Sequence, residues 1–217
     1  MRQRTEDEKI QTEGDRGRKG GEKRKEETKT GGHGDRLEGT SLLLHACCAP
    51  CLTYTSKEFR KDFDKVTALW FNPNIHPFQE YKRRFKALRK YEKEVGLDVI
   101  YLDRYGLDEF LEKALNVDSR CEYCLEWRLR KTAAEAVKRG YDAFSTTLVL
   151  SPYQDHDRLQ KIGSRAGREE EIDFIYHDMR DGFEEHHRLA DEMGLYKQGY
   201  CGCIFSEKER YHKKLID

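Results

Sequence analysis

Apolar and amphipathic stretches alternate along this chain from residue 41 onward. Where aliphatic, β-branched and aromatic residues run together, the pattern predicts short buried strands at 41–46, 65–72, 97–103, 141–150 and 171–178. Pro73 and Pro77 end the second strand, because a proline lacks the amide hydrogen that a central strand needs. The stretches between the strands are long enough to cross from one strand to the next as helices.

The helix predicted at 77–95 has the clearest periodicity. Apolar residues recur on one face at spacings of three and four: Phe78, Tyr81, Phe85, Leu88, Tyr91 and Val95. Gly96 is a natural stop signal after it. Further helices are predicted up to about residue 63, around 107–115, at 119–139, from Ser151 and Pro152 onward, at 183–193 and near the end of the chain. Strands separated by helices predict an α/β fold with a doubly wound, mainly parallel five-stranded sheet.

Residues 1–39 have a different composition from the rest. They hold almost no large apolar residue and no aromatic one, so they cannot bury enough surface to offset the entropy of ordering. We therefore expect a disordered charged tail at 1–39 and a single α/β domain at 40–217.

Charge and hydropathy narrow the class of protein. The 217 residues carry 41 basic and 41 acidic side chains, and no apolar run approaches the roughly 18 residues of a membrane span. The first residues lack the apolar core of a signal peptide. We expect a cytoplasmic protein without membrane contact, in which thiols stay reduced.

The seven cysteines fall into three groups, and none stands alone: Cys47, Cys48 and Cys51; Cys121 and Cys124; Cys201 and Cys203. Small buried hydrophobic cysteines would be scattered, and a disulfide framework needs an even number and an oxidising compartment. The grouping instead favours metal ligation. Cys121 and Cys124 lie one helical turn apart and face the same way, whereas Gly202 allows its two neighbouring cysteines to bend toward one centre.

Seven thiols exceed the four ligands of one structural zinc. They suit a [4Fe–4S] cluster on four cysteines with a second metal on the rest, and two zinc ions are the alternative. Because functional groups gather at the carboxyl ends of parallel strands, this centre is expected at the turn that follows the first strand. That turn has no glycine, which argues against a phosphate-binding loop there.

Five motifs resemble the QueH family of epoxyqueuosine reductases: "LLLHACCAPC" (42–51), "FNPNIHP" (71–77), "CEYCLEWRLRKTA" (121–133), "FSTTLVLSPYQDHD" (144–157) and "YKQGYCGCIFSE" (196–207). The resemblance implies a nucleotide-hydrolase-like (HUP) α/β fold. It also implies reduction of epoxyqueuosine in the anticodon loop of tRNA to queuosine, the last step of queuosine biosynthesis. An iron–sulfur cluster, an additional iron and an external electron donor are implied with it.

From the resemblance we expect all seven cysteines to ligate metal and four of them to hold the cluster, namely Cys47, Cys48, Cys121 and Cys124. Family members can carry aspartate at the position of Cys51, which implies that Cys51 faces the additional iron. Tyr153, Asp155 and His156 are the candidate catalytic residues, since they follow a strand end and the reaction needs a proton donor. His45 is expected to be a packed histidine rather than a ligand.

Basic residues on the predicted 80–94 helix, such as Arg83 and Lys90, are candidate contacts to tRNA phosphates. Two other classes of function stay open at this point. A zinc-stabilised tRNA-binding module without redox activity would be colourless. An ATP-dependent tRNA-modifying enzyme is disfavoured by the missing phosphate loop.

Overall fold

The computed structural model describes residues 37–212, all of which belong to the unit formed by residues 33–217. Five strands make one sheet in the order β3-β2-β1-β4-β5, and every neighbouring pair is parallel. The strands are β1 (Leu37–His45), β2 (Phe63–Trp70), β3 (Val99–Tyr101), β4 (Ala143–Thr146) and β5 (Asp173–Phe174). The predicted doubly wound α/β sheet is confirmed.

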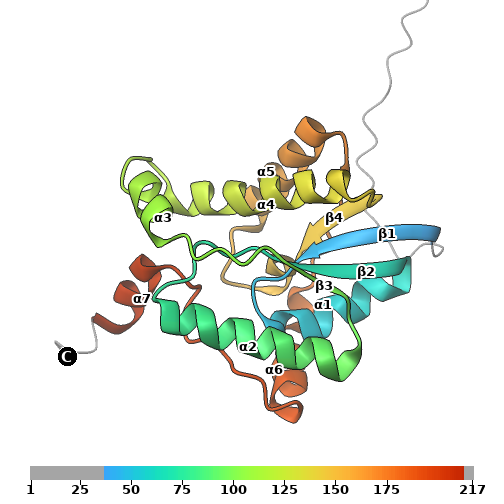
Figure 1. Ribbon diagram of the computed structural model, residues 1–217, viewed down its shortest axis with the longest axis horizontal. Helices are drawn as coiled ribbons and strands as arrows, with labels where there is room; N and C mark the ends of the chain where they lie inside the picture. The colour runs from blue at the N-terminus through green and yellow to red at the C-terminus, as the bar shows by residue number, and fades with distance from the viewer. Residues whose placement is uncertain (1–36, 213–217) are drawn as a thin grey trace, which may run out of the picture. The chain divides into compact units, whose positions relative to one another are not determined.

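Helices cover both faces of this sheet (Figure 1). On one face lie α1 (Ala49–Asp62), α2 (Phe78–Val95) and α6 (Phe183–Glu192), and on the other lie α4 (Arg120–Lys138) and α5 (His156–Glu170). Two shorter helices, α3 (Leu107–Ala114) and α7 (Ile204–Tyr211), flank the carboxyl edge. None of these helices has the length and apolar character needed to cross a membrane.

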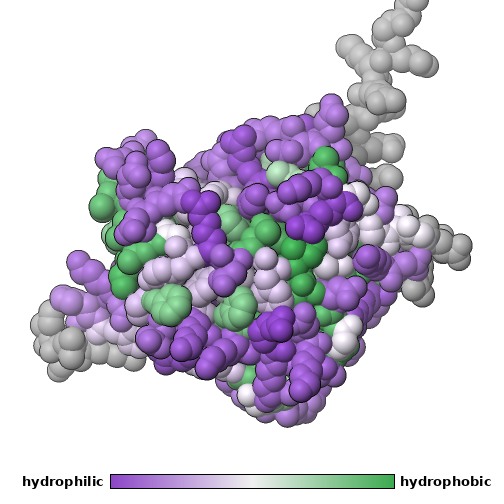
Figure 2. Space-filling view, viewed as in Figure 1, coloured by the Kyte–Doolittle hydropathy of each residue, from purple (hydrophilic) through white to green (hydrophobic). Residues whose placement is uncertain are grey.

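The central strand β1 is apolar because helices cover both of its faces. Leu42, Leu43 and Leu44 are fully buried. The edge strand β3 is only half-buried, and Figure 2 shows apolar side chains in its region between the polar flanks of α2 and α4. The end of β1, where the cysteines begin, therefore lies in the buried centre of the sheet.

Several element boundaries differ from the prediction. The fourth strand stops at Thr146, whose side chain accepts a hydrogen bond from the amide of Leu148 and turns the chain into a 3-10 helix at Thr147–Leu150. The helix predicted to begin at Ser151 and Pro152 begins at His156 instead, because Asp155 caps it by accepting from the amide of Arg158. Gly96 ends α2 in the left-handed conformation, as predicted.

The predicted tail lies almost wholly outside the described residues. Its last three positions, 37–39, belong to β1, which begins four residues before the predicted start at residue 41. For residues 1–36 the disordered tail stays a prediction.

Candidate functional site

The switch point of the sheet lies between β1 and β4, because the chain continues to β2 and β3 on one side and to β5 on the other. In open parallel sheets this crevice at the carboxyl ends is where ligands bind. Cys47 follows β1 here, and Thr147 follows β4. The Oγ1 of Thr147 donates to the Cys47 sulfur at 3.1 Å and accepts from the Cys47 amide at 3.1 Å. The two strand ends are thus joined directly at a cysteine.

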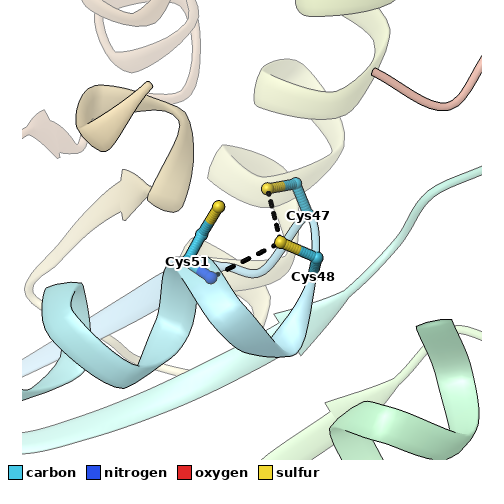
Figure 3. A group of neighbouring side chains, drawn as sticks. All are labelled: Cys47, Cys48 and Cys51. Carbon is cyan, nitrogen blue, oxygen red and sulfur yellow. Dashed lines mark hydrogen bonds between the residues drawn. The ribbon is translucent and has the colours of Figure 1, made fainter. Parts of the chain in front are cut away.

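Three cysteines converge at this turn (Figure 3). The sulfur atoms of Cys47, Cys48 and Cys51 lie within 4.8 Å of one another, and all three residues are buried. Cys48 is the N-cap of α1 and accepts from the amide of Cys51. Unpaired amides at a helix N-terminus favour thiolate over thiol, but at Cys48 burial outweighs this effect. We call this group the triad.

The spacing within the triad fits one metal ion. The sulfurs of Cys47 and Cys48 are 3.7 Å apart. Two thiolates bound to one tetrahedral metal at about 2.3 Å have sulfurs about 3.8 Å apart. The donor set, its burial and this distance therefore fit a metal held by the triad.

Protonation is shared unequally within the triad. Hydrogen bonds with the Cys48 and Cys51 thiols lower the pKa of Cys47 well below its usual value. Burial raises the pKa of Cys48 to about 12. The Cys47 thiol raises the pKa of Cys51, chiefly through their hydrogen bond. One thiolate is thus favoured without metal, and a metal that takes the other two as thiolates must displace their protons.

We call the remaining four cysteines the quartet; they interact electrostatically, but within residues 37–212 only the triad brings three metal-binding side chains within 4.8 Å of one another. Cys124 on α4 and Cys203 before α7 are buried and pack around Phe110. A hydrogen bond with the Cys203 thiol lowers the pKa of Cys201 to about 5. Burial is the main cause that raises the pKa of Cys124 to about 11, and the charges of Cys201 and Cys121 add to it. The predicted cluster ligands thus come in pairs from the triad and the quartet, and their assignment stays a prediction.

A buried ion pair fixes the loop that carries Cys201 and Cys203. Arg84 on α2 pairs with Glu80 at 2.7 Å, and both side chains are 2% exposed. The two terminal nitrogens of Arg84 donate to the carbonyl oxygens of Tyr200 at 2.9 Å and Cys201 at 3.0 Å. Tyr196 donates to the other Glu80 oxygen. This arrangement, which we call the clasp, joins α2 to the quartet.

Gly202 completes this loop. Its φ of +135° lies in a region that side chains disfavour, and a Cβ there would lie 3.1 Å from Ile75. Its carbonyl oxygen accepts from the amide of His76 at 2.7 Å. The predicted need for glycine between the two cysteines is confirmed.

Polar atoms without partners gather near the same edge. The buried side-chain atoms that lack a hydrogen bond in the described residues include Oδ1 of Asn72 and Asn74, Nδ1 of His76 and Oε1 of Gln198. Gln198 also donates to the Cys48 sulfur at 3.1 Å. Buried polar groups are normally paired. These unpaired atoms therefore indicate a place where a polar ligand would complete the missing hydrogen bonds.

The predicted catalytic residues have structural partners of their own. Asp155 caps α5 and pairs with Arg158 at 3.3 Å. His156 donates from Nε2 to the Ser151 carbonyl and accepts at Nδ1 from the Tyr176 hydroxyl, each at 2.9 Å. Tyr153 is 83% exposed and packs edge-on against Phe183. Within residues 37–212 none of the three forms a hydrogen bond or ion pair with a cysteine, and their catalytic role stays a prediction.

His45 is a packed histidine, as predicted. It is fully buried between Thr146 and the Phe71 carbonyl, and burial lowers its pKa to about 4. Sequence reasoning did not single out Thr147, Gln198 or Arg84. It counted Arg128 only among the basic residues 128–131 that would add to the contacts with tRNA, whereas the structure buries its side chain. Only Thr147 carried a signal in the sequence, because it directly follows a strand at the predicted edge.

Fold and site together define a parallel α/β protein with a candidate thiolate metal centre at the switch point of its sheet. Residues 42–209 match the family model described as Epoxyqueuosine reductase QueH. The chain therefore belongs to the QueH family of epoxyqueuosine reductases, which are oxidoreductases.

Similar proteins of that name occur in several bacteria. The Epoxyqueuosine reductase QueH of Dehalococcoides mccartyi is 39% identical over 173 residues, which cover 79% of this chain and 95% of that protein. The protein of the same name from Thermotoga maritima is 36% identical over 184 residues, covering 80% and 93%. The relative from Streptococcus pyogenes is 31% identical over 181 residues, covering 77% and 71%.

Proposed function

We propose that this protein reduces the epoxide of epoxyqueuosine in tRNA to the alkene of queuosine, with a [4Fe–4S] cluster and an additional iron held by its seven cysteines. The observation that carries the proposal is the buried triad at the carboxyl edge of the sheet, in a chain of the QueH family. The reaction consumes two electrons and two protons and releases water, so an external electron donor is needed.

Residues at the carboxyl edge of the sheet supply the proposed metal ligands and orient them. The triad places three cysteine sulfurs within 4.8 Å of one another, and Cys51 is the proposed position facing the additional iron. When bound, the cluster and the iron supply electrons and a Lewis-acid position for the epoxide oxygen. Thr147 and Gln198 orient the sulfurs of Cys47 and Cys48 by donating hydrogen bonds to them.

The proposed proton donors are Asp155 and His156. Asp155 also caps α5, so its replacement by alanine would remove the acid and the helix cap at the same time, and the two effects could not be separated. Asparagine caps a helix as well as aspartate does, so Asp155→Asn keeps the cap. It removes the acid together with an exposed ion pair to Arg158, which contributes at most about 1 kcal/mol to stability. A lower kcat with unchanged stability would support Asp155, and an unchanged kcat would exclude it. For His156→Gln, a lower kcat with unchanged stability would likewise support His156, and an unchanged kcat would exclude it.

Tyr153 is proposed to contact substrate rather than to transfer a proton. Its ring is exposed beside Phe183, and unpaired RNA bases stack on such aromatic rings. Tyr153→Phe keeps the ring, whereas Tyr153→Ala removes it. We expect the apparent KM for tRNA to rise only for Tyr153→Ala.

The proposed function is tested by an assay of the conversion of epoxyqueuosine to queuosine in tRNA. Protein reconstituted anaerobically with iron and sulfide is mixed with a low-potential reductant and tRNA that contains epoxyqueuosine. Mass spectrometry of the digested nucleosides should show the loss of one oxygen atom. Cys121→Ala and Cys124→Ala should lose both the brown colour and the conversion. If iron-replete protein leaves the substrate unchanged while an established reductase converts it, the proposal fails.

A zinc-stabilised tRNA-binding module is the second candidate. It is favoured by the 3.7 Å separation of the Cys47 and Cys48 sulfurs, which suits one tetrahedral ion. Metal analysis separates the two, because this candidate predicts a colourless protein that contains zinc and binds tRNA without converting it.

A further inference from the structure

Arg128 is a buried cation on α4, one turn after Cys124. Its side chain is 6% exposed, and its Nε donates to the Cys124 carbonyl oxygen at 3.1 Å. The other buried arginine of residues 37–212, Arg84, has Glu80 as its counter-ion. Arg128 forms no ion pair with any carboxylate in this described part of the chain. It is thus a buried charge without a conventional partner.

Such an arrangement is unfavourable unless an anion is present. A guanidinium does not release its proton in proteins, so Arg128 cannot become neutral as a buried lysine does. Burying an unpaired charge is strongly unfavourable even after the surrounding structure relaxes. One hydrogen bond to a carbonyl oxygen does not neutralise that charge. The anion must come from groups close to the guanidinium.

The groups within its electrostatic reach are those of the candidate site. The charge of Arg128 favours the thiolate at Cys124 and at Cys201, which belong to the quartet. It also acts on His45, at the end of β1, and Cys47 of the triad acts on the same imidazole. Through its hydrogen bond to the Cys124 carbonyl oxygen Arg128 lies beside the quartet, and its charge also acts on His45 at the end of β1. Each thiolate that a metal binds adds negative charge there.

We propose that Arg128 is the counter-ion of the metal–thiolate centre and that its charge sets both the metal affinity and the reduction potential of that centre. This rests on the proposed function only as far as a metal binds these cysteines. A fixed positive charge stabilises anionic thiolates. It also favours the more negative, reduced state of a redox metal, and so raises the reduction potential.

The test uses Arg128→Met, which removes the charge and keeps an unbranched side chain, and Arg128→Lys, which keeps the charge. The matched control is Arg130→Met on the same helix, since Arg130 is about half exposed and pairs with Glu126 and Glu169. Three quantities are measured in the full chain: metal retention against a chelator, the midpoint potential after reconstitution with iron and sulfide, and the thermal unfolding of metal-free protein.

We expect Arg128→Met to weaken metal binding by about 10–100-fold and to shift the midpoint potential to lower values. Arg128→Lys should lie closer to the wild type, and Arg130→Met should match it. In metal-free protein the loss of the charge should not destabilise the fold. Arg128→Met should unfold at an equal or higher temperature than the wild type, because it removes an uncompensated buried charge.

A purely structural arginine would give a different result, since its loss would destabilise the metal-free protein as well. Equal metal retention and equal midpoint potential in Arg128→Met and Arg130→Met would overturn the proposal. So would a wild-type protein that binds no metal. A wild type that binds metal but does not convert epoxyqueuosine would refute the proposed reaction, and these comparisons would still decide the role of Arg128.

Discussion

The clasp between α2 and the quartet gives the sharpest stability prediction. Glu80→Gln removes one charge of the clasp while keeping the size of the side chain. It leaves Arg84 buried without a counter-ion, with only neutral acceptors: the carbonyls of Tyr200 and Cys201 and the amide oxygen of the new glutamine. Breaking one side of a buried pair costs about 3–5 kcal/mol. For a protein of this size each kcal/mol lowers the unfolding midpoint by about 2–4 °C.

We therefore expect metal-free Glu80→Gln to unfold about 6–20 °C below the wild type, by circular dichroism. The loop should also loosen, because Arg84 no longer has a fixed orientation. Alkylation followed by mass spectrometry of peptides should show faster modification of Cys201 and Cys203 and an unchanged rate at Cys47. Arg89→Gln on the same helix is the control. Arg89 is 57% exposed and pairs with Glu92 at 3.2 Å, so its loss should cost at most about 1 kcal/mol.

Two results would refute this reasoning. If Glu80→Gln and Arg89→Gln shift the unfolding midpoint equally, the buried pair does not stabilise the fold as its burial implies. If Glu80→Gln lowers the midpoint but all cysteines react at wild-type rates, the clasp stabilises the protein without holding the quartet loop.

Further predictions concern the triad, acid stability and RNA binding. Cys51→Asp should retain more of the second metal than Cys51→Ala, because carboxylate still ligates iron; equal and complete loss in elemental analysis would argue against a metal role for Cys51. Burial lowers the pKa values of His45 and His76 to about 4, so both rings are neutral in the fold and take up protons on unfolding below pH about 6.5. The free energy of unfolding of metal-free protein, from urea titrations, should therefore fall as the pH is lowered from 6.5 to 5, by up to about 1.4 kcal/mol per pH unit for each histidine, and a free energy that does not change over this range would contradict this. For tRNA, Lys82→Glu with Lys86→Glu should weaken binding and reduce its salt dependence; an unchanged salt slope would assign this face of α2 to solvent. These lysines are better targets than Arg83 and Lys90, since Arg83 lies over Tyr196 and Lys90 binds the carbonyls that end α6.

The sequence by itself determined the elements and the class of chemistry. Alternating strands and helices, the apolar face of α2 and the stop at Gly96 follow from local periodicity and backbone preference, which a single stretch of chain carries within itself. The three cysteine groups could also be recognised in the sequence, because cysteines one helical turn apart, or on either side of a glycine, are close together in any fold that keeps that local structure.

Only the tertiary structure decided which distant groups meet. Thr147 reaches Cys47 across 100 positions because β1 and β4 are neighbours in the sheet, and no local pattern specifies strand order. Arg84 and Arg128 looked like ordinary members of charged helices, yet the packing of α2 and α4 buries them beside the quartet. The end of β4 and the start of α5 were misplaced in the prediction, since the side chains of Thr146 and Asp155 set these boundaries through hydrogen bonds. Periodicity reports which face of an element is buried, but burial of a charge and convergence of ligands arise from contacts between segments far apart in the chain.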